Sequence, residues 1–106
     1  MFGFLDMMGN YETRKVDRYD GESLMVSTAA VTDGDYPFET AILHPDYNDG
    51  NHVIVEAYDD REAAQSGHDK WVKIMTGDPL PDKLRDCANA AVAKFIGEED
   101  FPRVTL

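Results

Sequence analysis

The chain has few of the residues on which disulfide-stabilised, membrane-spanning or nucleic-acid-binding proteins depend. It contains one cysteine, Cys87, in 106 residues, so neither an internal disulfide nor a thiolate metal cluster can form. Its 10 Lys and Arg stand against 21 Asp and Glu, and the net charge of −11 opposes binding to nucleic-acid polymers or anionic membranes. Apolar runs last only a few residues, far short of the roughly 20 that a membrane-spanning helix needs.

Motifs for catalysis and metal binding are also missing from the sequence. His44, His52 and His68 are scattered and form no His-x-x-x-His pair, and there is no glycine-rich phosphate loop or nucleophile elbow. Residues 46–51 have the composition of a calcium loop. With Gly50 at the loop's glycine position, however, Pro45 falls where an oxygen ligand belongs. We therefore expect a binding protein that is not an enzyme, with no cofactor and no metal.

What is present is the composition of one ordinary globular domain, 1–106, with 42% apolar and 29% charged residues. Residues 1–10 are expected to form an apolar N-terminal arm, which is mobile, packed on the domain or covering a neighbouring subunit. They lack the basic region and cleavage site of a secretory signal. Residues 98–106 are expected to be a C-terminal tail. Cys87 is expected to be a small buried hydrophobe. A single cysteine, without disulfides, fits a reducing, cytoplasmic setting.

Four strands are predicted by apolar–polar alternation, over 12–19, 22–32, 38–47 and 52–58. Asp20-Gly21 and Asp49-Gly50 are suited to two-residue hairpin turns. Such turns would place Arg14 opposite Ser27 in the first hairpin, and Lys15 opposite Val26.

The same turn in the second hairpin would divide its side chains between two faces. One face would carry Phe38, Thr40, Ile42, Val53, Val55 and Ala57, and would form a floor for helices. The other would carry Glu39, Ala41, Leu43, Ile54, Glu56 and Tyr58. This second face is too apolar for a plain solvated surface, and it suggests a partner subunit or a ligand groove.

After residue 58 the apolar period changes from two to 3.6, which predicts two helices. The first is capped by Asp59 with Glu62, and it ends at Gly77 and Pro79. Its apolar face is formed by Ala64, Gly67, His68, Trp71, Val72 and Met75. The second begins at Pro81, with a stripe of Leu84, Cys87, Ala88, Ala91, Val92 and Phe95. The expected fold class is α+β, a four-stranded antiparallel sheet of two hairpins followed by two helices packed on one face.

Several of these residues are candidates for ligand binding. His68 and Trp71 share a helix face, on which Gly67 allows a close approach by a strand or a ligand. His68 is either a structural imidazole or a hydrogen-bonding group at a pocket rim, and Trp71 is either core or platform. The aromatic residues Tyr11, Tyr36, Tyr47 and Tyr58 lie near turns and strand ends, where rings can stack on a base.

Cations are concentrated on the first strand. Arg14 or Lys15, with the Ser27 and Thr28 hydroxyls, could receive a phosphate, because Arg forks suit bidentate phosphate contacts. The alternative is that these cations are solvated and paired with neighbouring carboxylates. The candidate ligand-binding set is therefore Tyr11, Arg14, Lys15, Ser27, Thr28, Thr40, His68 and Trp71.

Residues 24–72 carry a series of short pieces in a fixed order. They are Ser27-Thr28, Phe38-Glu39-Thr40, Tyr58-Asp59, Glu62-Ala63-Ala64 and Gly67-His68. In these pieces the chain resembles a widespread family of short proteins from tailed phages. It is also similar to the phage anti-CBASS sponges, which sequester cyclic-dinucleotide immune signals.

The resemblance implies a non-enzymatic homo-oligomer in the host cell cytoplasm, which holds a cyclic nucleotide ligand such as 3′,3′-cyclic GMP–AMP without cleaving it. Two other functions remain open. One is an acidic inhibitor that occupies a basic surface of a host protein, which the charge of −11 favours. The other is a minor virion component.

Overall fold

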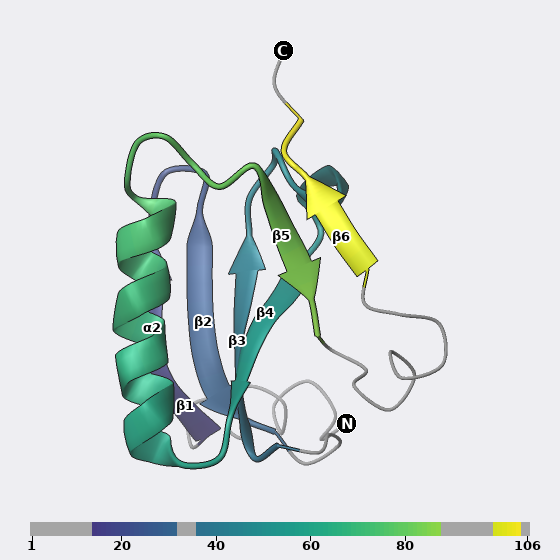
Figure 1. The fold of residues 1–106 in the computed structure, drawn as a ribbon. Helices are drawn as coiled ribbons and strands as arrows, with labels where there is room; N and C mark the ends of the chain where they lie inside the picture. Colours follow the sequence, from purple (N-terminus) through teal and green to yellow (C-terminus); the bar gives the residue numbers. More distant parts are fainter. Residues whose placement is uncertain (1–13, 32–35, 88–98, 105–106) are drawn as a thin grey trace, which may run out of the picture.

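The computed structural model describes residues 14–31, 36–87 and 99–104. Its centre is an antiparallel sheet in the strand order β1-β2-β3-β4 (Figure 1). The strands are β1 (Lys15–Asp20), β2 (Met25–Ala30), β3 (Phe38–Leu43) and β4 (Val53–Tyr58). The predicted α+β class and the four antiparallel strands are confirmed.

The turn of the first hairpin is longer than predicted. Asp20 pairs with Met25, so residues 21–24 form the connection, closed by a hydrogen bond from Gly21 N to Leu24 O at 2.7 Å. This changes the register, and Arg18 lies opposite Ser27 while Lys15 lies opposite Ala29. The predicted partners of Arg14 and Lys15 were therefore wrong.

The second hairpin also departs from a two-residue turn. A single 3-10 turn, η1 (Asn48–Gly50), lies in the connection, and Asn48, Asp49 and Gly50 all have positive φ. Ile42 consequently pairs with Val53, whereas a two-residue turn at Asp49-Gly50 would place it opposite Ala57. Thr40 pairs with Glu56 and Ala41 with Ile54, so Val55 is the extra residue of a β-bulge.

That bulge reverses which side chains of β4 face the helix. Beyond the extra residue, Glu56 and Tyr58 share the face of Thr40, where alternation without a bulge placed Val55 and Ala57. Placing Glu56 and Tyr58 on the outer face was therefore wrong. A bulge leaves no mark in a pattern of alternating residue types, and the outer face loses two of the side chains expected there.

One helix, α2 (Arg61–Met75), packs against all four strands. Its N-cap is Asp60 instead of Asp59, and the Asp60 carboxylate accepts a hydrogen bond from Ala63 N at 2.7 Å. Ala64, Gly67, His68 and Met75 are buried, which confirms most of the predicted apolar face.

The predicted second helix was wrong over the residues that the structure describes. Lys83–Asp86 form β5, which pairs with β6 (Glu99–Pro102) in a separate two-stranded sheet. Residues 99–102 thus form a strand where a tail was expected. Leu84 fits either a helical stripe or a strand, and its burial against the main sheet, with the bond from Cys87 N to Ile54 O at 2.8 Å, favours the strand. The rest of the predicted helix, 88–98, lies outside the described residues.

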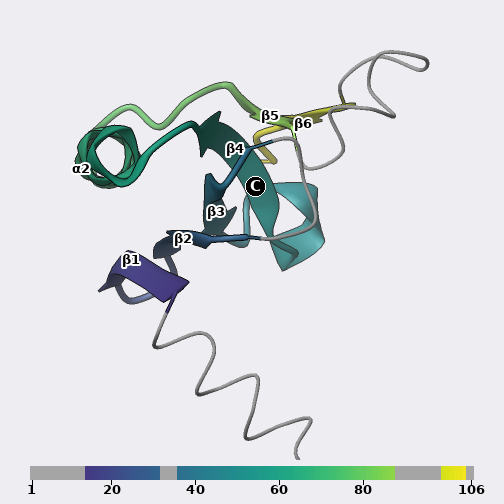
Figure 2. The same ribbon diagram turned by 90° about the horizontal axis from the view of Figure 1, so that it is seen from below.

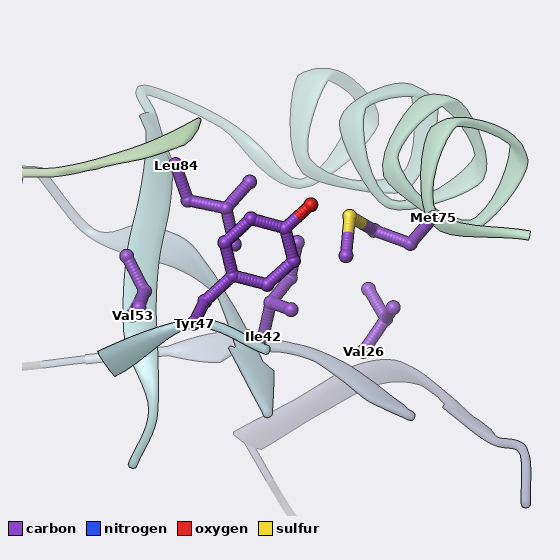
Figure 3. Close-up of a cluster of buried hydrophobic side chains, with 6 residues drawn as sticks. All are labelled: Val26, Ile42, Tyr47, Val53, Met75 and Leu84. Atoms are coloured by element: carbon purple, nitrogen blue, oxygen red, sulfur yellow. The ribbon is translucent and has the colours of Figure 1, made fainter. Parts of the chain in front are cut away.

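The core lies between the main sheet, α2 and β5. Its buried cluster contains Val26, Ile42, Tyr47, Val53, Met75 and Leu84 (Figure 3). Tyr47, expected to be available for stacking, is 1% exposed, and its hydroxyl donates to Pro81 O at 2.5 Å. Seen from below, α2 and the β5–β6 pair lie on the same side of the main sheet (Figure 2).

Two further predictions lie outside the described residues, namely the N-terminal arm 1–10 and the candidate Tyr11. Among the described residues, no helix combines the length and the apolar character that crossing a bilayer requires.

Candidate functional site

Three of the candidate residues meet beneath α2, although they come from different elements. Thr28 of β2 and Thr40 of β3 are cross-strand partners, with their hydroxyl oxygens 2.6 Å apart. The Nδ1 atom of His68, on α2, lies 2.8 Å from the Thr28 hydroxyl. Thr28 and Thr40 are 0% exposed and His68 is 2% exposed, so each polar atom depends on the others for hydrogen bonding.

The chain of hydrogen bonds continues to β4. The Thr40 hydroxyl lies 2.9 Å from the hydroxyl of Tyr58, which is itself 3.4 Å from the Glu56 carboxylate. Burial raises the pKa of Tyr58 to about 12, so the hydroxyl keeps its proton at neutral pH. We call the residues Thr28, Thr40, Tyr58 and His68 the polar chain.

Glycine at position 67 makes room for the polar chain. A Cβ atom there would overlap the ring and hydroxyl of Tyr58, so the helix can approach β4 this closely only without a side chain. The close approach that the sequence indicated at Gly67 is confirmed, and the element that approaches the helix is strand β4, through Tyr58.

Glu56 lies at one end of the polar chain and binds two groups of α2. Its carboxylate accepts from the Trp71 indole N–H at 2.8 Å and from the Lys70 ammonium at 2.5 Å. Burial acts to raise the pKa of Glu56, but the bonds from Lys70 and Trp71 outweigh it and leave the pKa below its ordinary value. Trp71 thus fastens α2 to β4, and its N–H is engaged within the protein.

Asp17, on the edge strand β1, lies at the other end of the polar chain, beside His68. Its carboxylate is 3.9 Å from Nε2 of His68, and accepts from Gln65 Nε2 at 3.0 Å and from Arg18 N at 2.8 Å. The bond from Gln65, followed by that from the Arg18 amide, lowers the pKa of Asp17 below its ordinary value. The carboxylate is therefore ionised and held in position.

A pocket of about 240 Å³ opens at this end, between β1 and α2. We call it the β1–α2 pocket, and its lining consists of Asp17, Arg18, Tyr19, His68, Asp69 and Val72. In the described part of the chain, every fully buried side-chain nitrogen or oxygen has a hydrogen-bond partner. Nε2 of His68 has none within bonding distance, so this atom reaches the surface of the pocket.

A larger cavity, of about 380 Å³, lies where the 21–24 turn meets the β3–β4 connection. It is lined largely by turn residues and contains His44, whose Nδ1 is occupied by a bond from Asp46 N at 3.0 Å. The smaller pocket is the better candidate site, because a buried polar network ends in it.

The remaining predicted site residues lie elsewhere. Ser27 is aligned with Arg18 and Ala41 and faces away from α2, opposite in direction to Thr28. Trp71 is at the Glu56 end, and neither Arg14 nor Lys15 lines the pocket. The structure brings together Thr28, Thr40 and His68, and it adds Asp17, Tyr19 and Asp69. Carboxylates are so frequent in this acidic chain that nothing in the sequence distinguished Asp17 and Asp69.

The order Asp17, His68, Thr28 is that of an orienting carboxylate, a base and a hydroxyl nucleophile. Thr28 is fully buried, however, and its hydroxyl is bonded to Thr40, so a substrate has no access to it in this conformation. The described residues contain no group of three or more His, Cys, Asp or Glu side chains placed to hold a metal ion.

Acidification is expected to weaken the folded state through Glu56. Because its folded pKa is below the ordinary value, stability that is present above the unfolded pKa is lost as the pH falls through the folded pKa. Glu56→Gln should therefore flatten the loss of stability between about pH 6 and pH 3, as measured by urea unfolding at each pH. Glu22→Gln, in the exposed 21–24 turn, is the matched control and should keep the wild-type slope. An unchanged slope in Glu56→Gln would contradict the prediction.

A scan against protein-family models, a search of curated proteins and a search of solved structures each returned no match for this chain.

Proposed function

We propose that this protein binds a cyclic dinucleotide such as 3′,3′-cyclic GMP–AMP in the host cytoplasm and sequesters it without cleaving it. The observation that carries the proposal is the β1–α2 pocket, where an open imidazole nitrogen, two carboxylates and a tyrosine side chain meet. Hydrogen bonds to the edge of a base and stacking on its face are the two contacts by which proteins hold nucleobases.

The size of the pocket supports one base per chain. Its volume of about 240 Å³ is below the roughly 300 Å³ at which pockets begin to enclose drug-sized ligands. A dinucleotide would fill such a pocket with one base and extend beyond it. A second copy of the chain would then receive the second base, which agrees with a homo-oligomer binding a two-fold ligand.

The phosphates would have to be met locally, because the net charge of −11 repels anions at long range. Arg18 belongs to the edge strand β1 beside the pocket. Its side chain, 42% exposed and paired with Asp20 at 3.0 Å, lies on the same face of the sheet as Ser27, away from α2. In this proposal the ligand extends beyond the pocket around the edge of the sheet, and Arg18 there takes the phosphate-binding role that the sequence suggested for Arg14 or Lys15.

Isothermal titration calorimetry with cyclic GMP–AMP tests the proposal. Saturable binding is expected, and chromatography after heat release should return the nucleotide intact. His68→Gln and the exposed-site variant Asp69→Ala should each weaken binding by on the order of tenfold, about 1.4 kcal/mol. His44→Gln, a histidine outside this pocket, is the matched control and should bind like the wild type.

Failure to bind any member of a panel of cyclic oligonucleotides would overturn the proposal. Recovery of a linear nucleotide would replace sequestration by hydrolysis. A complex with a basic host protein that weakens steeply with salt would favour the acidic inhibitor instead.

A further inference from the structure

The polar chain determines where His68 carries its proton. Tyr58 has one hydroxyl proton and two possible acceptors, Thr40 at 2.9 Å and Glu56 at 3.4 Å. A hydroxyl that donates to a carboxylate typically lies about 2.5–2.7 Å from it. The contact with Glu56 is much longer, and that oxygen already accepts from Trp71 and Lys70. The Tyr58 proton is therefore assigned to Thr40.

The remaining protons follow in sequence, because each threonine hydroxyl has one proton to donate. Thr40 accepts from Tyr58 and donates to Thr28, which in turn donates to Nδ1 of His68. A neutral imidazole that accepts at Nδ1 carries its proton on Nε2. Nε2 is the atom that reaches the pocket, so His68 presents an N–H donor there.

The donor on His68 lies among acceptors. Asp17 is 3.9 Å from Nε2, too far for a direct hydrogen bond and near enough for one ligand edge to contact both groups. Gln65 donates to both Asp17 and Asp69, at 3.0 and 3.1 Å, and so holds the two carboxylates of the pocket close to each other. Each carboxylate keeps lone pairs for further donors.

We propose that the β1–α2 pocket selects guanine over adenine. The Watson–Crick edge of guanine has two adjacent N–H donors beside one carbonyl acceptor, which matches carboxylates beside a single N–H donor. Adenine has one amino donor and a ring-nitrogen acceptor on that edge, and it leaves a carboxylate acceptor without a partner. The proposal rests on the proposed function, and it deepens that function by naming the base that this site takes.

Calorimetry with cyclic di-GMP, cyclic GMP–AMP and cyclic di-AMP tests the selection. Wild-type protein should bind cyclic di-GMP at least about tenfold more tightly than cyclic di-AMP, within the range of discrimination of one bidentate base contact. Cyclic GMP–AMP should lie between the two, because only one of its bases is guanine. Asp17→Asn should remove most of that preference, because an amide replaces one carboxylate oxygen by a donor. Asp59→Asn, an exposed aspartate that precedes α2 and lies outside this pocket, should keep it.

Equal affinity for the three ligands would overturn the selection and leave the proposed function standing, whereas no binding of any ligand would remove both. Nitrogen-15 NMR of the ligand-free protein supplies an independent outcome. Neutral His68 should show the Nε2–H tautomer, and the Nδ1–H tautomer would overturn the assignment of the donor.

Discussion

Replacing Gly67 with alanine is expected to destabilise the folded protein by about 2 kcal/mol, although alanine is the better helix former. The helix propensity of alanine is more favourable than that of glycine by about 1 kcal/mol. It is outweighed by overpacking against Tyr58, which costs about 1–3 kcal/mol, and by the hydrogen bond to Thr40 that a displaced Tyr58 would lose, about 1–3 kcal/mol. Urea denaturation at neutral pH measures the difference.

The physical cause can be isolated in the background of Tyr58→Ala. With the ring absent, the added methyl group has space, and Gly67→Ala should there stabilise the protein by up to about 1 kcal/mol. The sign of the effect should thus reverse between the two backgrounds. Destabilisation of similar size in both would show that the glycine serves some purpose other than admitting Tyr58.

Thr28→Val is expected to cost about 3 kcal/mol of folding stability, although the two side chains have nearly the same shape. The Thr28 hydroxyl is fully buried and bonds both Thr40 and His68. Valine would leave a threonine hydroxyl and an imidazole nitrogen without this partner, and each unsatisfied buried group costs about 1–3 kcal/mol.

Thr28→Ser is the matched comparison for the hydroxyl. It keeps the hydrogen-bonding oxygen and loses one buried methyl group, for which a loss of about 1 kcal/mol is expected. Urea unfolding of both variants gives the comparison. If valine were tolerated and serine were costly, the methyl contact would carry the stability and the polar chain would not.

The class of fold could be predicted from the sequence because its signals are local. Alternation from residue 15 to 58, followed by a 3.6-residue period from 61 to 75, identifies four strands and a helix without knowledge of their partners. The burial of Ala64, Gly67, His68 and Met75 follows from the same helical period. An acidic residue at the start of the helix marked its N-terminus to within one position.

The candidate site was predictable in part. Thr28, Thr40 and His68 were named as separate candidates, and each belongs to the polar chain or opens on the pocket. Their contact with one another, and the part played by Tyr58, depend on the register of two hairpins. Turns of unpredicted length and one extra residue at Val55 changed that register, and a shift of one residue moves every later side chain to the other face.

Composition and periodicity by themselves determined an acidic α+β domain with one cysteine, no metal-binding spacing and a helix whose buried face contains Gly67 and His68. Only the tertiary structure decided that Leu84 belongs to a strand and that Asp17 faces His68. The tertiary structure also decided that Nε2 of the buried His68 opens on the β1–α2 pocket. The physical reason is that helix and strand periods are encoded by neighbouring residues. Pairing, bulges and hydrogen-bond direction are set instead by groups distant in the chain, which must satisfy one another once water is excluded.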